Sequence, residues 1–208
     1  MHHGHIRAIL FDFGGVFADE GFYHALRELA REQRLAVKDM PAAGMQAVYE
    51  TGYVLGHGDE HAFWERLRQR TGLKGRDEEL TKRVLQGFRV RPGMRQLVRE
   101  LRQRGYLVGL LSDQTDWLDR LDAEQHFYRE FDTLYISHRL GKGKRDPSLY
   151  GDVARDLGME PGAILFIDDN PDNVARARRR GWQAVRFIDE AQLRRELIRR
   201  GLLDSPTP

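Results

Sequence analysis

The sequence predicts an α/β fold, in which a Rossmann-like open parallel sheet has helices on both faces and a helical cap domain is inserted after the first strand. Three observations support this prediction. Short apolar runs recur along the 208 residues, helical patterns ending in glycine separate them, and a long, mostly helical stretch follows the first run. Because the runs are apolar throughout rather than alternating, they are typical of strands covered on both faces. The alternation of strand and helix favours an open sheet with right-handed crossovers.

Five segments are expected to form the strands of this sheet. Four are near-continuous apolar runs, and the last one is weaker. In chain order they are Ala8–Phe11, Tyr106–Ser112, Thr133–Ser137, Ala163–Asp169 and Gln183–Phe187.

Three helices are expected between the strands, the first of them just before the second strand. In residues 94–105, apolar side chains recur at positions 94, 97, 98 and 101, and Gly105 ends the pattern. Residues 146–158 and 170–181 repeat this pattern and also end in glycine. Each of these helices would pack one apolar face on the sheet.

The segment between the first two strands is far longer than a crossover needs. Four helical patterns within it predict a helical cap domain over residues 18–88, with residues 89–93 as the return linker. Residues 1–17 and 89–208 would then form the α/β core domain. The aromatic side chains of the cap are expected to form its own core or, alternatively, a wall facing the substrate: Phe22, Tyr23, Phe63 and Trp64.

The composition argues against several classes of protein. Lys and Arg number 34 against 32 Asp and Glu, a net charge of +2, so the basic concentration that nucleic-acid binding requires is missing. The absence of cysteine excludes a disulfide framework and thiolate chemistry. No apolar segment approaches the roughly 18 residues of a membrane span, and none near the start is typical of a signal peptide. We therefore expect a cytoplasmic protein with no nucleic-acid or membrane partner; its oligomeric state is open.

Polar residues stand where the expected strands end. Ligands of open α/β sheets bind beyond the carboxyl ends of the strands, so several of these residues are expected to converge. They are Asp12, Ser112, Ser137, Asp168 and Asp169. Carboxylates gathered in one place repel one another, and a divalent cation would neutralise them. Ligation by oxygen alone favours Mg²⁺.

Four segments carry a family resemblance in their order along the chain: FDFGGV (11–16), LLSD (110–113), SHRLGKGKRDPSLY (137–150) and ILFIDDNPDNVARARRRGWQAV (164–185). They resemble the four motifs of the haloacid dehalogenase-like (HAD) superfamily of hydrolases, in its subclass with a helical cap after the first strand. The resemblance covers nearly the whole chain. Within the superfamily the chain resembles bacterial sugar-phosphate phosphatases that act on α-D-glucose 1-phosphate.

The resemblance implies catalytic and substrate-binding roles for the matching residues. Asp12 would attack phosphorus as the nucleophile and form an aspartyl-phosphate. Lys144, which fits the motif better than Lys142, would contact Asp12 and the phosphate and stabilise the charge of the transition state. Ser112 would bind a phosphoryl oxygen, with Asp113 beside it in the substrate-binding motif. The expected partner is a small phosphorylated metabolite.

The resemblance also implies a Mg²⁺ site. Asp12 and Asp169 would bind the ion directly, Gly14 would bind it through its backbone carbonyl, and Asp168 would support it from behind or through water. Asn173 would help to orient these groups. The ion would shield the phosphate so that an anionic nucleophile can approach it.

Three positions depart from the family pattern. Gly14 stands where most of these phosphatases have a second Asp, which protonates the leaving alcohol and later activates water. The carbonyl of Gly14 is retained, but the proton donor is lost, which is worth roughly 10²–10⁴ in rate. Asp113 adds an anion beside the phosphate site, and Arg145 replaces a common proline.

Three functions are compatible with these residues. The first is a Mg²⁺-dependent phosphatase of a small phosphometabolite that favours good leaving groups. The second is a 2-haloacid dehalogenase, which also lacks the second Asp; the acidic pair at 168 and 169 argues against it, because such relatives need no metal and resemble S-S-N there. The third is a phosphatase-like binding or regulatory protein with low turnover.

Overall fold

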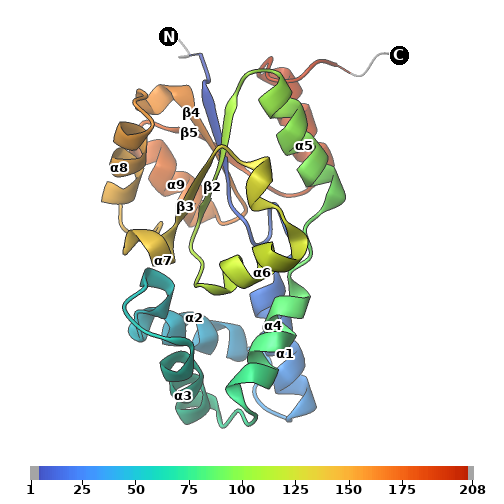
Figure 1. Cartoon of the computed structure of the whole chain (residues 1–208), viewed down its shortest axis with the longest axis vertical. Helices are drawn as coiled ribbons and strands as arrows, with labels where there is room; N and C mark the ends of the chain where they lie inside the picture. The colour runs from blue at the N-terminus through green and yellow to red at the C-terminus, as the bar shows by residue number, and fades with distance from the viewer. Residues whose placement is uncertain (1–4, 206–208) are drawn as a thin grey trace.

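The computed structural model describes residues 5–205, and these contain one five-stranded sheet (Figure 1). Its order is β3-β2-β1-β4-β5, and every neighbouring pair in this order is parallel. The expected parallel sheet is thus confirmed, and each strand lies within its expected segment, at most one residue shorter at either end. The strands are β1 (Ala8–Phe11), β2 (Leu107–Ser112), β3 (Thr133–Ile136), β4 (Ile164–Asp168) and β5 (Gln183–Arg186).

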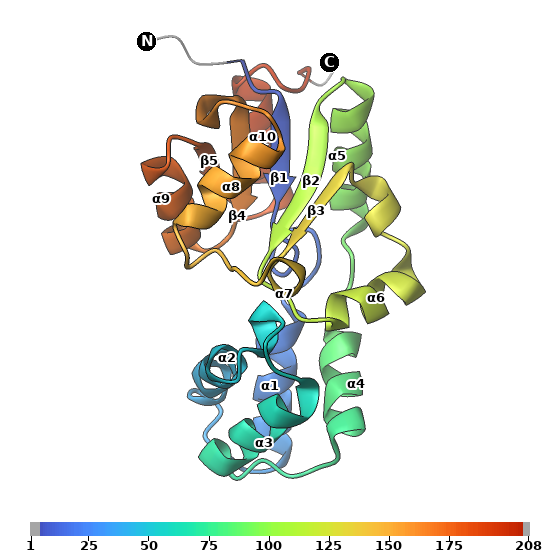
Figure 2. The same ribbon diagram turned by 60° about the vertical axis from the view of Figure 1, so that its left-hand side comes forward.

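Helices cover both faces of the sheet, as expected. Successive side chains of a strand point to opposite faces. Ile9 and Phe11 of β1 accordingly join one buried cluster with α5 and α10, whereas Ala8 and Leu10 join another with α8 and α9. Figures 1 and 2 show α8 and α9 on the side of the sheet away from α5. The four helices are α5 (Pro92–Gln103), α8 (Ser148–Asp156), α9 (Pro171–Arg179) and α10 (Glu190–Arg199).

Four further helices form a bundle between β1 and β2 in the chain, and we call it the helical bundle. It lies beyond the carboxyl ends of the strands, in the lower half of Figure 1. Phe63 and Trp64 are fully buried within it, and the Trp64 indole Nε1–H donates to the Thr81 hydroxyl at 2.8 Å. The helices are α1 (Gly21–Glu32), α2 (Met40–Glu50), α3 (Glu60–Thr71) and α4 (Asp77–Gly87), with a short 3₁₀ turn, Tyr53–Leu55.

The two connections between the helical bundle and the sheet run side by side. Asp19 donates its N–H to the Arg89 carbonyl at 2.9 Å, and Arg91 donates to the Phe17 carbonyl at 3.0 Å. The expected return linker of residues 89–93 is shorter than predicted, because α5 already begins at Pro92. Proline suits this position since the N–H that it lacks has no partner in the first turn of a helix.

Some helices were not predicted from the sequence. α6 and α10 are rich in charged residues, and α7 is a single turn that takes over Ser137 from the expected third strand. None of the helices in residues 5–205 is both long and apolar enough to cross a membrane. The helices without a prediction are α6 (Trp117–Gln125), α7 (Ser137–Leu140) and α10.

The close packing of the sheet generates a stability prediction at Gly109 in β2. A Cβ at this position would lie 2.5 Å from Thr133 Cγ2 and 2.8 Å from Leu10 Cδ2. Gly109→Ala is therefore expected to lower the free energy of unfolding by about 1–3 kcal/mol. Urea unfolding followed by circular dichroism measures it.

Gly151→Ala is the matched control for this substitution. Gly151 is exposed in α8, and its added methyl group would meet nothing within 4 Å. Alanine there is expected to raise the free energy of unfolding by up to about 1 kcal/mol. Equal unfolding free energies for the two variants would contradict the packing argument.

Candidate active site

Asp12 is the first residue after β1, and its side chain is held in one orientation. Its own N–H continues the sheet by donating to the Ile167 carbonyl at 2.9 Å. One carboxylate oxygen, Oδ1, accepts from the Ser112 hydroxyl at 2.6 Å and from the Phe13 N–H at 2.8 Å. The side chain is buried, with the residue 8% exposed. Burial raises the pKa of Asp12 to about 8, although Lys144 opposes this shift.

Lys144 lies between two buried carboxylates. Its Nζ is 2.8 Å from Asp12 Oδ2 and 2.7 Å from Asp168 Oδ2. Burial disfavours the ammonium form, but the two carboxylates outweigh burial and hold the pKa of Lys144 well above its usual range. Lys142, by contrast, contacts Asp152 and Ser148 at the surface. The structure thus brings Lys144 to Asp12, as the sequence predicted, and Lys142 lies elsewhere.

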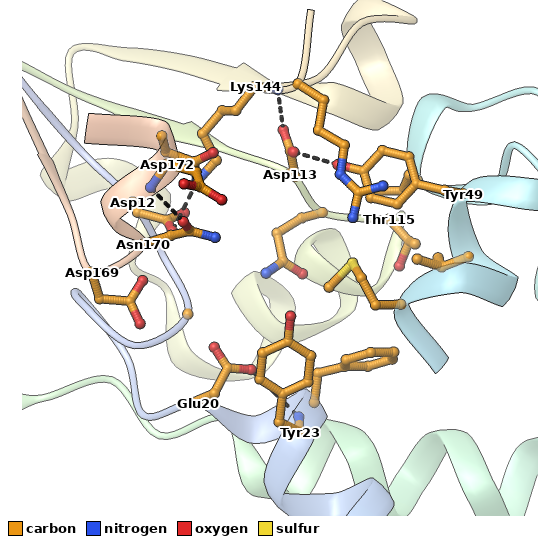
Figure 3. A pocket seen from close by; sticks show the side chains of 18 of the residues that line it. Asp12, Glu20, Tyr23, Tyr49, Asp113, Thr115, Lys144, Asp169, Asn170 and Asp172 are labelled. Atoms are coloured by element: carbon orange, nitrogen blue, oxygen red, sulfur yellow. Dashed lines mark hydrogen bonds and ion pairs between the residues drawn. The ribbon is translucent and has the colours of Figure 1, made fainter. Parts of the chain in front are cut away.

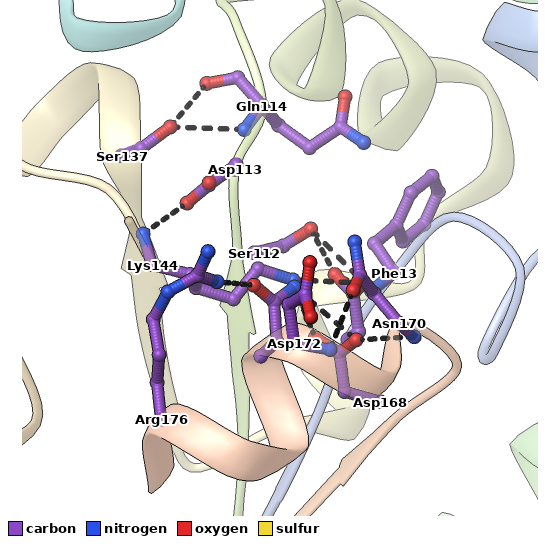
Figure 4. A network of polar contacts seen from close by, with 12 residues as sticks. Phe13, Ser112, Asp113, Gln114, Ser137, Lys144, Asp168, Asn170, Asp172 and Arg176 are labelled. Carbon is purple, nitrogen blue, oxygen red and sulfur yellow. Dashed lines mark hydrogen bonds and ion pairs between the residues drawn. The ribbon is translucent and has the colours of Figure 1, made fainter. Parts of the chain in front are cut away.

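Asp168 is fully buried at the end of β4 and belongs to a polar network (Figure 4). Besides Lys144, it accepts hydrogen bonds from the Asn170 N–H at 2.8 Å and from the Asn173 side-chain amide at 3.1 Å. These hydrogen bonds orient the Asp168 carboxylate, which in turn positions the ammonium of Lys144. Asn173 lies where the resemblance places it, next to the acidic pair.

Asp169 points into the adjoining cavity and approaches the turn after Asp12 (Figure 3). Its Oδ2 lies 2.5 Å from the position that a Cβ on Gly15 would occupy. Gly15 also has a φ of +79°, which favours glycine. Burial raises the pKa of Asp169, and the charge of Asp168 adds to this effect. The turn after β1 therefore needs glycine at position 15 to admit this carboxylate.

The acidic cluster fits a divalent cation. Asp12, Asp168 and Asp169 each offer a carboxylate oxygen, and these oxygens lie within 4.8 Å of one another. Three carboxylates against the single ammonium of Lys144 leave an excess of negative charge in a buried place. Hard oxygen donors and this excess charge suit Mg²⁺. Gly14 lines the same cavity, and its carbonyl is the remaining expected donor.

A cavity of about 440 Å³ opens beside this cluster, between the sheet and the helical bundle (Figure 3). The sheet side supplies Asp12, Asp169, Lys144 and the loop after β2, whereas Asp168 is fully buried in contact with Lys144. The helical bundle supplies an aromatic and apolar wall. That wall consists of Phe22, Tyr23, Met45, Val48, Tyr49 and Phe88. Of the four aromatic residues considered from the sequence, Phe22 and Tyr23 therefore face the cavity, whereas Phe63 and Trp64 form bundle core.

Asp113 is held in place by two hydrogen bonds. It accepts from the backbone N–H of Lys144 at 2.8 Å and from the Tyr49 hydroxyl at 2.6 Å. Burial, with a contribution from Asp113, raises the pKa of Tyr49, so its hydroxyl keeps the proton that it donates. The Arg145 guanidinium stacks on the Tyr49 ring at 3.6 Å from the centroid. The Asp113 carboxylate thus has two hydrogen-bond donors. Its contact with the Tyr49 hydroxyl joins the loop after β2 to α2.

One expected member of the site lies outside it. Ser137 does not line the cavity; its hydroxyl donates to the Val54 carbonyl at 2.7 Å and accepts from the Gln114 N–H at 3.0 Å. Other residues line the cavity that the sequence did not predict, above all Glu20 and Tyr49. Nothing in the pattern of α2 distinguishes Tyr49 from other half-buried helix positions.

Glu20 reaches the cavity from the residue before α1. Its Oε1 accepts from the Tyr23 N–H at 3.4 Å, which makes it the N-cap of the helix. Its Oε2 lies 3.1 Å from the position that a Cβ on Gly14 would occupy. Burial raises the pKa of Glu20 to about 7, the Tyr23 N–H opposes the shift, and Asp169 adds to it. The only sequence signal at Glu20 is an acidic residue just before a helix, and that signal indicates a helix N-cap rather than a catalytic group.

A family model described as haloacid dehalogenase-like hydrolase matches residues 6–181. Among curated proteins, the chain is 27% identical to a D-ribitol-5-phosphate phosphatase from Bacteroides thetaiotaomicron, over 92% of this chain and 97% of that protein. It is 24% identical to the putative phosphatase YhcW from Bacillus subtilis, over 86% of this chain and 82% of that protein.

Solved structures share the fold. A HAD family enzyme from Bacteroides thetaiotaomicron, in complex with magnesium and inorganic phosphate, matches 90% of this chain and 98% of its own with a TM-score of 0.67 and 21% identity. An L-2-haloacid dehalogenase from Xanthobacter autotrophicus with covalently bound chloropropionic acid matches 95% of this chain and 84% of its own. Its TM-score is 0.64 and its identity 21%.

The contact between Gly15 and Asp169 generates a prediction about Mg²⁺ binding. A methyl group at position 15 would displace the Asp169 carboxylate, so Gly15→Ala is expected to weaken Mg²⁺ binding about 10–100-fold. Isothermal titration of Mg²⁺ into the protein measures the effect.

Gly105→Ala controls for backbone strain. Gly105 has a similar φ of +87°, but a Cβ there would meet nothing within 4 Å. Both variants are expected to lose about 1–2 kcal/mol of stability from the left-handed backbone. Only Gly15→Ala should alter Mg²⁺ binding, and equal Mg²⁺ affinities in the two variants would contradict this assignment of Asp169.

Proposed function

Because the chain belongs to the haloacid dehalogenase-like hydrolase family, we propose that it is a Mg²⁺-dependent phosphatase of a small phosphorylated metabolite, acting through an aspartyl-phosphate on Asp12. The observation that carries this proposal is the cluster of Asp12, Asp168 and Asp169, with the buried ammonium of Lys144 between the first two, beside a cavity that Asp12 and Asp169 line. The cytoplasm remains the proposed compartment, on the basis of the cysteine-free composition.

The proposed reaction has two steps at Asp12. In the first step an oxygen of Asp12 forms a bond to phosphorus, and the bond from phosphorus to the leaving oxygen breaks. In the second step water attacks the acyl phosphate, which releases inorganic phosphate and restores the carboxylate. Ser112 and the Phe13 N–H hold the carboxylate in a fixed orientation for the attack. Bound Mg²⁺ would supply positive charge that offsets the negative charge of the phosphate, so that the anionic carboxylate can approach it.

Lys144 supports both steps through its charge. Its ammonium lies 2.8 Å from Asp12, where charge develops on the transferring phosphoryl group. Since Asp168 contacts the same ammonium, Lys144 is held in place before the substrate arrives. Without the contact to Asp168, the Lys144 ammonium would be mobile and would stabilise the transition state less well.

The substrate is proposed to be a sugar or polyol phosphate, and residues 18–88 are proposed to act as the cap over the core of residues 1–17 and 89–208. The name of the ribitol-phosphate relative supports this substrate class. The cavity supports it as well, because aromatic faces of the helical bundle stand opposite polar groups of the sheet side. Such a combination suits a polyhydroxylated chain with one phosphate.

The dehalogenase alternative is less well supported. Its substrate is a carboxylate anion that would enter a cavity already lined by Asp12 and Asp169. Such an anion would be repelled unless a cation were bound, whereas a phosphate with Mg²⁺ matches the charge of the cluster. The dehalogenase of similar structure shares the fold, at 21% identity.

The first test concerns Asp12. Asp12→Asn is expected to lower phosphate release by more than about 10³-fold, because an amide cannot serve as the nucleophile. Phosphate release from sugar phosphates and p-nitrophenyl phosphate is measured with Mg²⁺ and with EDTA, beside halide release from 2-chloropropionate. EDTA is expected to abolish phosphate release.

Asp19→Asn is the control for this test, since Asp19 is exposed and pairs with Arg91 outside the cavity. It should retain activity. Halide release without metal would favour the dehalogenase. No turnover at all, with Asp12→Asn unchanged in ligand binding, would favour the binding protein.

A second test concerns the hydrogen bond that restrains Asp113. Tyr49→Phe removes one of the two donors to this carboxylate, so Asp113 can turn toward the phosphate and repel it. KM is expected to rise about 3–10-fold with kcat little changed, since a typical hydrogen bond contributes about 0.5–1.5 kcal/mol. Steady-state kinetics measure the split.

Tyr135→Phe is the matched control. Tyr135 also donates to a carboxylate, Asp156, at 2.6 Å, but it does not line the cavity. Both variants should lose similar stability, and only Tyr49→Phe should raise KM. An unchanged KM in Tyr49→Phe would show that Asp113 needs no restraint.

A further inference from the structure

We propose that Glu20, from the start of α1, is the catalytic acid and base for the leaving group and the attacking water, in place of the side chain that Gly14 lacks. This inference rests on the proposed phosphatase function. It concerns a residue outside the four sequence motifs and on the other side of the cavity from the sheet.

The position of the carboxyl group carries the argument. Glu20 Oε2 lies 3.1 Å from the Cβ position of residue 14. A carboxylate oxygen of an aspartate lies about 2.4 Å from its own Cβ, as bond lengths dictate. The Glu20 carboxyl therefore occupies the neighbourhood that the side chain of an aspartate at position 14 would fill. The turn has no acidic side chain at position 14, and the Glu20 carboxyl fills that space.

The orientation of the group also fits. Oε1 accepts the Tyr23 N–H, and Oε2 is the oxygen nearest Gly14. Figure 3 shows the carboxyl pointing into the cavity, on the side where Asp169 lies and below Asp12. It thus faces the region where the phosphate and its leaving oxygen would sit if Asp12 is the nucleophile.

The backbone around Glu20 is fixed on both sides. The Asp19 N–H donates to the Arg89 carbonyl at 2.9 Å. Gly21 packs so closely on α4 and the residue after it that a Cβ there would lie 2.6 Å from the Phe88 nitrogen. Such a restrained backbone presents the side chain at a constant place, which general acid–base catalysis requires.

The other carboxyl groups of the site are engaged, assigned to the metal or exposed. Asp169 is proposed as a Mg²⁺ ligand, and Asp172 is exposed at the start of α9. Asp12 and Asp168 contact Lys144, and Asp113 accepts two hydrogen bonds. No histidine lines this cavity in the part of the chain that the structure describes. Glu20 is thus the acid best placed for proton transfer.

The proton balance closes over one turnover. As the phosphorus–oxygen bond to the leaving group breaks, the Glu20 carboxyl gives its proton to that oxygen, and a neutral alcohol departs. Glu20, now a carboxylate, then takes a proton from the water that attacks the aspartyl-phosphate on Asp12. Phosphate is released and Glu20 is protonated again, so the net reaction consumes one water and needs no other reactant.

The test compares substrates that need a proton with substrates that do not. Glu20→Gln keeps the shape and an oxygen acceptor for the Tyr23 N–H but cannot transfer a proton. For an alkyl substrate such as glycerol phosphate, kcat/KM is expected to fall by about 10² or more, whereas for p-nitrophenyl phosphate it should change less than about threefold.

Asp59→Asn is the matched control, because Asp59 is likewise the N-cap of a bundle helix and accepts from the Ala62 N–H at 2.8 Å. It should change kcat/KM for neither substrate. Thermal unfolding of Glu20→Gln and Asp59→Asn measures any stability lost through the altered helix cap. Gly14→Asp combined with Glu20→Ala should restore part of the alkyl phosphate activity that Glu20→Ala alone loses, since alanine vacates the space beside position 14 and leaves no like charge there.

Equal loss on both substrates in Glu20→Gln, or no loss on either, would overturn the inference while leaving the proposed function intact. Failure of the proposed function looks different. In that case the wild-type protein itself would release no Asp12-dependent phosphate from either substrate, and the role of Glu20 would fall with it.

Discussion

The contact on which the rest of the site depends is the ammonium of Lys144 between Asp12 and Asp168. It joins the residue after β1, the end of β4 and the loop before α8, three segments that are far apart in the chain. Buried charges are costly unless each has good partners, and the loss of one partner from such a cluster is far more harmful than its presence is stabilising. Ser112 and Asn173 complete the hydrogen bonding of the two carboxylates. The carboxyl edge of the sheet is therefore specified by polar contacts, whereas its interior is specified by apolar packing.

The helical bundle meets the sheet side through aromatic packing, in which Trp117 of α6 lies against Phe63 and Trp64, and through polar contacts. The hydroxyl of Tyr49 reaches Asp113, and the hydroxyl of Ser137 reaches the Val54 carbonyl. Two neighbouring backbone connections complete the junction. The cavity lies between the two parts, so Asp12 and Lys144 belong to the sheet side and most of the apolar wall belongs to the bundle. Under the proposed function, Asp12 and Lys144 act on phosphorus from the sheet side, whereas Glu20 and the wall that contacts the rest of the substrate come from α1 and the helical bundle.

The sequence predicted what depends on local pattern and simple topology. Strands buried on both faces stand out as apolar runs, and parallel strands bring their carboxyl ends together, so the convergence of Asp12, Ser112 and Asp168 followed from order alone. The charged helices α6 and α10 were missed because their apolar faces are narrow. Tyr49 and Glu20 could not be found, because their places depend on how α1 and α2 dock beyond the sheet. The two carboxylate oxygens of Glu20 have different surroundings, since one caps the helix while the other faces Gly14.

The location of Glu20 has a consequence for how this chain can evolve. Glu20, Phe22 and Tyr23 belong to the same turn at the start of α1, and all three line the cavity. Any mutation that tilts this helix moves an acidic group and an aromatic wall together. In a protein with its acid on the sheet turn, the bundle can diverge toward new ligands while the reacting groups stay untouched. Here the acidic group and the wall that contacts the ligand belong to the same helix turn, so selection for a new ligand also acts on proton transfer.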